Sequence, residues 1–455
     1  MIHIKNALAV MTRADSEVLN NVDVVIKGSA IHEVGRSLTP PPGSDVEVIP
    51  GEGLVVTPGL VNTHHHFYQT FTRNIPFAQD AKLFDWLVYL YDVWKHMDAD
   101  TVWWSTVLAT AELLKTGCTT TTDHHYLYPA GINTDIMALQ FDAASRTGIR
   151  FSPTRGSMSR SKKNGGLPPD STVQSEKTIL DDSERTIKEF HDPGPWAMRK
   201  VALAPCSPFS VSEQLMKETA SLARRYGVRL HTHLAETKDE EEYCVQTYGR
   251  RPLKLMEDCG FIGRDVWFAH GIFFDDEELD VLASTGTSIA HCPSSNMRLG
   301  SGICRVRDML DKGVNVALAV DGSASNDTSD MLGEIRQALL LQRVSLGAGA
   351  LSAREAWRMA TENGTKLLGF EKIGRIEPGW AADLALFDVN TLGYVGALSD
   401  PAAALLFSGY NHQASYTIVN GSVVVANGNL VGLDEKEITA KSSEAVNALY
   451  ARADL

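Results

Sequence analysis

The chain has 455 residues, 44% hydrophobic and 22% charged, which is the composition of a folded protein with room for one large domain and a smaller one. Its net charge of −14 at pH 7 argues against a nucleic-acid partner, and no apolar run reaches the roughly 18 residues that a membrane span needs. The six cysteines are scattered without a C-x-x-C pair, and the first residues carry no secretory signal pattern. These features predict a soluble cytoplasmic protein without a membrane partner.

The two ends of the chain carry short strand-like alternations separated by turns. Examples are residues 23–28 near the start and residues 383–387 near the end. Neither end alone can bury much apolar surface, so we expect both to form one small β-sandwich domain from residues 1–57 and 376–455. Residues 434–455 have the pattern of a closing helix within that part.

Between the ends, one pattern recurs in chain order: a short apolar run, a polar end, then a segment of helical period. The apolar runs cover residues 54–62, 118–123, 149–153, 200–204, 228–234, 266–269, 287–290 and 314–320. Near-continuous apolar strands that alternate with helices predict a parallel sheet covered by helices. Eight such units favour a closed (β/α)8 barrel over residues 58–375, and an open doubly wound sheet is the alternative. The polar loop at 156–172 is a candidate lid over the mouth.

The first apolar run ends in His64-His65-His66. Residues i and i+2 of a strand share a face, so His64 and His66 should direct their imidazoles to one side and His65 to the other. Two imidazoles on one side are a beginning of a divalent-metal site, but a complete site needs further ligands.

The carboxyl ends of all strands in such a barrel open onto one mouth, where catalytic residues gather. These ends carry, in chain order, His64 and His66, Asp123 with His124 and His125, Cys206, His231 with His233 and Glu236, His270, His291, and Asp321. A lone core histidine is more often a packing residue than a ligand. Histidines at one strand end after another, followed by an aspartate, indicate a metal-dependent active site.

Several segments resemble the amidohydrolase superfamily, and within it the aminohydrolases that deaminate purines, pyrimidines and triazines. They are PGLVNTHHH at 58–66, HTHLAE at 231–236, AHG at 269–271, HCPSSN at 291–296, VDG at 320–322 and GRIEPGWAADL at 374–384. The resemblance implies one divalent metal per chain, zinc or alternatively ferrous iron, held by His64, His66, His233 and Asp321. A second metal is not implied, because the fourth strand ends in Ala-Pro-Cys and not in a bridging lysine.

The resemblance also implies roles for three residues. Asp321 would accept a proton from the attacking water, and His270 would stabilise the tetrahedral intermediate. Glu236 would protonate the ring nitrogen beside the attacked carbon and then pass a proton to the leaving ammonia. Without the resemblance, Glu236 could be a surface carboxylate of the acidic stretch at 239–242. The role of His291 stays open between shaping the surroundings of the water and capping a loop.

The residues expected to contact substrate are Gln69, Cys206, Trp103 and His291. Gln69 offers both a donor and an acceptor, which suits the amide-like edge of an oxopurine. Trp103 offers flat apolar surface, although tryptophans in this helical region more often belong to the core. Cys206 stands where nucleoside deaminases of the group usually have histidine, which argues against a ribose-bearing substrate.

Together with segments 64–69, 118–125, 204–210 and 291–299, the resemblance implies deamination of a free oxopurine base, 8-oxoguanine to urate and ammonia. Guanine or isocytosine deamination, triazine amino- or chlorohydrolysis and a non-catalytic ligand-binding barrel are the alternatives. The expected partner is a small heterocycle, and a homo-oligomer is possible.

Overall fold

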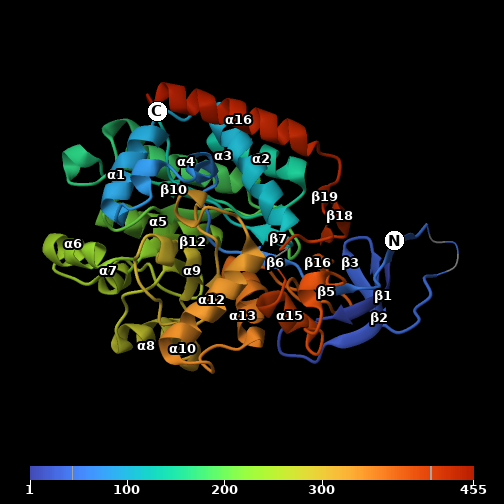
Figure 1. Cartoon of the computed structure of the whole chain (residues 1–455). Coiled ribbons are helices and arrows are strands. Elements are labelled where there is room, and N and C mark those ends of the chain that lie inside the picture. The colour runs from blue at the N-terminus through green and yellow to red at the C-terminus, as the bar shows by residue number, and fades with distance from the viewer. Residues whose placement is uncertain (42, 44, 410–411) are drawn as a thin grey trace.

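The computed structural model describes residues 1–41, 43, 45–409 and 412–455, and its centre is a parallel barrel (Figure 1). The barrel strands are β6 (Leu60–Asn62), β7 (Cys118–Thr121), β8 (His124–His125), β9 (Arg150–Phe151), β10 (Thr154–Ser157), β11 (Ala202–Pro205), β12 (Arg229–Leu234), β13 (Val266–His270), β14 (Ser288–His291) and β15 (Val316–Leu318). All pairings between them are parallel, in the orders β6-β7-β9 and β8-β10-β11-β12-β13-β14-β15. The predicted parallel sheet is confirmed.

The two sheets belong to one closed barrel of eight strands. β8 continues β7 after two residues, and β10 continues β9 in the same way, so both strands take part in both sheets. The last strand returns to the first, because the Thr63 backbone N–H donates to the Leu318 carbonyl oxygen at 3.2 Å. The (β/α)8 prediction is therefore confirmed, and the open doubly wound alternative is wrong.

Helices cover the outside of the barrel. They are α1 (Leu83–Trp94), α2 (Ala99–Lys115), α3 (Ile136–Thr147), α4 (Glu176–Phe190), α5 (Glu213–Tyr226), α6 (Lys238–Tyr248), α7 (Pro252–Asp258), α8 (Asp276–Thr285), α9 (Pro293–Arg298), α10 (Val306–Asp311), α11 (Ser323–Asn326), α12 (Met331–Leu346), α13 (Ala353–Ala360), α14 (Glu362–Leu368) and α15 (Pro401–Phe407). Side-chain oxygens of Asp98, Ser212 and Asp275 accept backbone N–H bonds at the starts of α2, α5 and α8. Within the described ranges, no helix is both long and apolar enough to cross a bilayer.

The two ends of the chain join in one nine-stranded sheet beside the barrel (Figure 1). Its strands are β1 (Ile2–Val10), β2 (Leu19–Lys27), β3 (Ala30–Gly35), β4 (Glu47–Pro50), β5 (Leu54–Pro58), β16 (Leu384–Asp388), β17 (Tyr416–Val419), β18 (Ser422–Ala426) and β19 (Asn429–Leu430). The antiparallel pair of β5 and β16 connects the N-terminal strands to the C-terminal ones. Strands from both ends bury one apolar cluster, which includes Ile4, Val24, Val56, Leu386 and Ile418.

The sequence pattern predicts one strand for the apolar run at 54–62. The structure instead has two strands there, in different sheets. β5 pairs with β16, whereas β6 pairs with β7 in the barrel. Gly59 separates them at a point where a Cβ atom would lie 2.1 Å from the Thr119 hydroxyl oxygen. Only glycine lets the chain pass so close to that side chain.

The C-terminal helix α16 (Glu435–Arg452) does not lie on the terminal sheet, where the sequence division places it. It crosses the barrel helices and packs along α2 (Figure 1). The Tyr450 hydroxyl donates to the Phe71 carbonyl oxygen at 2.9 Å, and Arg452 pairs with Asp98 at 2.9 Å. Leu449 is fully buried in the same apolar cluster as α1, so burial against the barrel decides the position of this helix.

Candidate metal-dependent active site

Three imidazoles and one carboxylate converge at the carboxyl ends of the strands. His66 Nε2 lies 3.1 Å from His233 Nε2, and Asp321 Oδ1 lies 3.2 Å from His64 Nε2 and 3.3 Å from His66 Nε2. Four ligands at 2.0–2.1 Å around a tetrahedral zinc ion would stand about 3.3 Å apart. The spacing of these four atoms therefore fits one ion of this kind.

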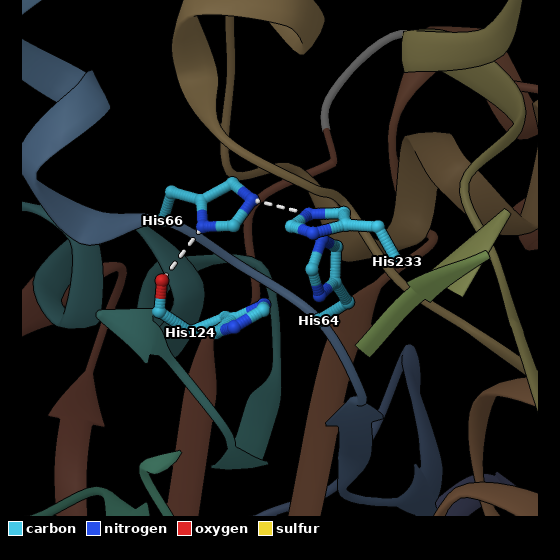
Figure 2. A group of neighbouring side chains, drawn as sticks. All are labelled: His64, His66, His124 and His233. Carbon is cyan, nitrogen blue, oxygen red and sulfur yellow. Dashed lines mark hydrogen bonds between the residues drawn. The ribbon is translucent and has the colours of Figure 1, made fainter. Parts of the chain in front are cut away.

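The protonation of His66 and His233 supports a cation between them (Figure 2). His66 Nδ1 donates to the His124 carbonyl oxygen at 2.8 Å, and His233 Nδ1 donates to the Cys206 carbonyl oxygen at 2.6 Å. Each neutral imidazole has one N–H, so both Nε2 atoms carry a lone pair. Two lone pairs that face each other at 3.1 Å repel, and a shared metal ion would turn that repulsion into two bonds.

A second histidine fixes the tautomer of His64. His231 Nδ1 donates to the Trp267 carbonyl oxygen at 3.0 Å, so its Nε2 must accept from His64 Nδ1 at 2.8 Å. His64 Nε2 then has a lone pair, and this buried atom has no hydrogen-bond partner within the described part of the chain. Burial also lowers the pKa of His64 well below its usual range and keeps the ring neutral. His231 therefore orients a ligand from one layer deeper in the barrel.

We expect the His231→Phe variant to bind zinc roughly 10- to 100-fold more weakly. This is the usual effect when a metal-binding histidine loses the hydrogen bond of its other ring nitrogen. Phenylalanine keeps the stacking on Trp267 but cannot accept from His64. Competition with a chelator measures the dissociation constant. His291→Phe is the matched control, because neither ring nitrogen of this buried histidine has a partner among the described residues. Equal zinc affinity in the two variants would refute the role of His231.

Asp321 divides its two oxygens between different partners. Oδ2 accepts from the hydroxyls of Ser295 at 2.6 Å and Ser325 at 3.1 Å, whereas Oδ1 accepts from the Gly322 backbone N–H at 2.7 Å and faces the histidine nitrogens. The residue has a positive φ of 64°, as do Ala235 at 55° and His270 at 71°. Non-glycine residues in this conformation cost energy and persist where surrounding contacts fix them, commonly at active sites.

Glu236 lies beside the ligands without being one of them. It is 6% exposed, and its Oε2 lies 3.5 Å from His270 Nε2. The His270 ring is fixed because Nδ1 donates to Asn296 Oδ1 at 2.9 Å. Both carboxylate oxygens of the buried Glu240 accept backbone N–H bonds, from Ala235 at 3.0 Å and Glu236 at 2.9 Å. Burial raises the pKa of Glu236 to about 7, which suits a residue that gives and takes a proton near neutral pH.

A cavity opens next to the ligands. Its lining residues are His66, Gln69, Leu83, Trp86, Leu87, Tyr91, Tyr126, Cys206, Phe209, His233, Glu236, His270, Leu299, Asp321 and Ser325. The structure thus brings the expected ligands, Glu236, His270, Gln69 and Cys206 to one space, with His64 directly behind it. Gln69 comes from the short 3-10 helix η1 (Phe67–Thr72), and the apolar wall comes mainly from α1.

Two residues expected to contact substrate, and the candidate lid, do not line this cavity. Trp103 does not line it: α2 packs behind η1, and Trp103 is half-buried against the main core. His291 is fully buried at the end of β14 and does not reach the cavity either. The loop at 156–172 contributes no lining residue, whereas α1 contributes several.

The sequence reasoning missed Trp86, Tyr91, Tyr126 and Phe209 as lining residues. Tyr126 directly follows the polar end at 123–125, which was a usable signal. Trp86 and Tyr91 belong to a helix that follows the first strand end closely, and aromatic residues there could have been favoured over Trp103.

Other histidines in this region have structural partners. His124 Nε2 donates to the Ala204 carbonyl oxygen at 3.1 Å, and its ring stacks on that of His233 with centroids 4.8 Å apart. His125 Nε2 donates to the Leu127 carbonyl oxygen at 2.7 Å. His65 points away from the ligands and contacts the Ser329 hydroxyl at 3.0 Å. The prediction that His65 turns away from His64 and His66 agrees with this geometry.

Asp123 holds the segment that carries Gln69. Its fully buried carboxylate accepts from the Phe67 backbone N–H at 2.7 Å and from Gln140 Nε2 at 2.6 Å. Burial raises its pKa to about 7, although both hydrogen bonds lower it. The native state therefore binds the Asp123 proton more tightly than the unfolded chain does, so this residue makes the unfolding free energy fall as pH rises from about 4 to about 7.

We expect the Asp123→Asn variant to lose this pH dependence. Asparagine can keep the bond from Phe67 and donate to Gln140 Oε1, an atom that now lacks a partner within the described ranges. The difference in unfolding free energy between the variant and the parent should therefore shift in favour of the variant by roughly 2–4 kcal/mol from pH 5 to pH 8. Urea unfolding at both values measures it, with the exposed Asp142→Asn as control. A gain that is equal at both pH values would contradict the prediction.

The comparison with protein families decides the assignment, because a model described as the amidohydrolase family matches residues 55–424. The chain belongs to the amidohydrolase family. An amidohydrolase relative from Pseudomonas aeruginosa, 8-oxoguanine deaminase, is 44% identical over 98% of this chain and 99% of its own length. Hydroxydechloroatrazine ethylaminohydrolase from a Pseudomonas species is 39% identical over 94% of this chain and 91% of its own.

Solved amidohydrolase structures agree with the fold and with a metal site. Atrazine chlorohydrolase TrzN from Arthrobacter aurescens, solved in complex with zinc, superposes with a TM-score of 0.93. It is 32% identical, and the match covers 98% of this chain and all of that one. In the present amidohydrolase, two overlapping groups of side chains could hold such a metal: His64, His66, His124 and His233, and His64, His270 and Asp321.

Proposed function

We propose that this protein is an aminohydrolase that converts 8-oxoguanine and water to urate and ammonia. The observation that carries the proposal is its similarity to 8-oxoguanine deaminase along almost the full length of both chains. The cavity supports it, since Gln69 and Cys206 lie beside the candidate ligands in a space lined by flat and apolar side chains.

We propose that the cofactor is one zinc ion per chain, held by His64, His66, His233 and Asp321. Three neutral imidazoles and one carboxylate form an ordinary zinc ligand set, and the unpaired Nε2 atoms fit a cation. When bound, the ion would lower the pKa of a water molecule and so supply the nucleophile that attacks C2 of the purine.

The side chains of this protein would then manage the protons. Asp321, held by two serine hydroxyls, accepts a proton from the attacking water. Glu236 begins protonated, since burial raises its pKa to about 7, and gives its proton to the ring nitrogen beside C2. Glu236 then takes the proton of the new hydroxyl group at C2 and passes it to the exocyclic nitrogen, so that the C2–N bond breaks and ammonia leaves. The proton held by Asp321 restores the acid form of Glu236. Although burial lowers it, the nearby Glu236 and Asp321 raise the pKa of His270. In its protonated form, with Nδ1 donating to Asn296, His270 would use its Nε2–H to stabilise the charge that develops on the attacking oxygen.

The cavity favours a free base over a nucleoside. Leu83, Leu87 and Tyr91 of α1 face it from one side, and Phe209 closes it from another. These side chains provide flat and apolar surface for a planar ring but few groups for ribose hydroxyls. Cys206, in place of a histidine, offers only a weak hydrogen-bond donor. We also propose a cytoplasmic location, which agrees with six free, buried cysteines.

An ammonia-release assay on the purified enzyme tests the proposal. The panel contains 8-oxoguanine, guanine, isocytosine, adenosine and hydroxyatrazine, so that purine, pyrimidine and triazine activities compete directly. We expect kcat/KM to be highest for 8-oxoguanine, with urate as the product by absorbance. A higher value for guanine, isocytosine or a triazine would replace the proposed substrate with that compound.

A further inference from the structure

Three buried polar atoms of the cavity wall lack a hydrogen-bond partner within the described part of the chain, the hydroxyl of Tyr91 and two others. The two others are the indole N–H of Trp86, a residue only 3% exposed, and Oε1 of Gln69, a residue 1% exposed. Both residues line the cavity beside the candidate ligands. A buried donor or acceptor without a partner is costly, so such atoms in a cavity wall indicate bonds that are made to a ligand.

Neighbouring rings hold the two residues in place. The Trp94 ring packs edge to face against both Trp86 and Tyr68, with centroids 5.6 Å and 5.1 Å apart. Its own indole N–H donates to the Thr72 hydroxyl at 3.1 Å, which ties α1 to the end of η1. Trp86 and Gln69 therefore stand on two elements with one shared support, and neither has freedom to leave the cavity wall.

Gly322 provides the space that Gln69 occupies. A Cβ atom on this glycine would lie 1.9 Å from Gln69 Oε1 and 2.4 Å from its Cδ. The glycine has a φ of −71°, which any residue can adopt, so the backbone does not require glycine here. Glycine is required here because the carboxamide of Gln69 occupies the space that a side chain at position 322, next to Asp321, would fill.

We propose that Gln69 and Trp86 are a specificity-determining pair that recognises an amide-type edge of the substrate, a ring N–H beside a carbonyl. Gln69 Oε1 accepts from the ring N–H, Trp86 donates to the carbonyl oxygen, and Gly322 sets the position of Gln69. The inference rests on the proposed function and narrows it: oxo-heterocycles bind, and amino-heterocycles of the same shape without the carbonyl are rejected. A site whose buried polar groups stay unpaired discriminates strongly against such analogues.

Binding to zinc-loaded enzyme that carries Glu236→Gln, and so forms product about 10³-fold more slowly, tests this pair. Rapid ultrafiltration compares two couples that each differ by one carbonyl, 8-oxoguanine with 2-amino-8-oxopurine and isocytosine with 2-aminopyrimidine. In whichever couple binds to the enzyme, Trp86→Phe should raise the dissociation constant of the oxo compound about 10- to 100-fold. It should raise that of the compound without the carbonyl less than about threefold. Leu87→Ala, an apolar lining residue of the same helix, is the control and should weaken both compounds equally.

A double-mutant cycle tests the role of Gly322. Gly322→Ala should weaken the oxo compound at least tenfold in the parent but not in a Gln69→Ala background, because the clash requires the Gln69 side chain. Zinc content, measured in every variant, separates this effect from damage to the metal site. An equal loss in both backgrounds, or unchanged discrimination in Trp86→Phe, would overturn the inference. Discrimination that appears only with isocytosine would instead overturn the proposed substrate and leave the pair intact.

Discussion

Replacing Glu236 with glutamine is expected to lower kcat by about 10³-fold, within the 10²–10⁴ range that positioned proton transfer contributes, while zinc content stays unchanged. The carboxylate lies 3.5 Å from His270 and is not part of the ligand group, so its charge is not needed to hold the ion. Glutamine retains the shape of the side chain, and Glu240 still fixes the backbone of residue 236. What the variant loses is the proton.

The pH dependence gives this prediction a second measurement. Because burial raises the pKa of Glu236 to about 7, its acid form dominates below that pH and disappears above it. We expect kcat of the parent enzyme to fall as pH rises through about 7, and the residual activity of Glu236→Gln to lack that limb. Steady-state ammonia release between pH 5.5 and 9 measures both. The exposed Glu242→Gln on α6, the helix that follows Glu236, is the control, and a Glu236→Gln rate within tenfold of the parent would remove Glu236 from the mechanism.

The barrel could be predicted from short-range periodicities, whereas the choice of four metal ligands among the polar strand ends needed the resemblance to the amidohydrolase superfamily. The two-residue period of a strand puts His64 and His66 on one side and turns His65 away. The alternation of apolar runs with helices predicts that the strand ends meet, which brings His233 and Asp321 to the same mouth. These inferences need only the pattern and the chirality of the fold.

The cavity wall could not be predicted in the same way. Whether Trp86 or Trp103 faces the substrate depends on how α1 and α2 pack against η1, and hydrophobic period does not specify which neighbour a helix face meets. The tautomer of His64 depends on His231 and Trp267, which approach only in the folded barrel. The separation of β5 from β6 depends on the Thr119 side chain, which lies beside Gly59 although it is 60 residues away along the chain.

Removing the metal ion is expected to abolish more than 99% of the activity and to lower the thermal midpoint of unfolding. In the metal-free protein, the lone pairs of His66 and His233 face each other at 3.1 Å and Asp321 Oδ1 approaches His64 Nε2 at 3.2 Å, with no cation to compensate. An ion that binds only the native state stabilises it by about 4 kcal/mol at a thousandfold excess over Kd. Calorimetry and ammonia release on chelator-treated protein measure the two losses.

Adding metal back distinguishes the loss of the bound ion from unspecific effects of the chelator on the protein. Zinc should restore both activity and thermal midpoint, whereas Mg²⁺ should restore neither, because it prefers oxygen ligands in an octahedral arrangement. In the His66→Gln variant the zinc-dependent rise of the midpoint should shrink, since one of three nitrogen ligands is missing. Full activity at less than a tenth of an equivalent of metal would refute the metal site. A midpoint that rises equally with zinc in the parent and in His66→Gln would instead locate the ion elsewhere, because the repulsion that zinc relieves requires the His66 nitrogen.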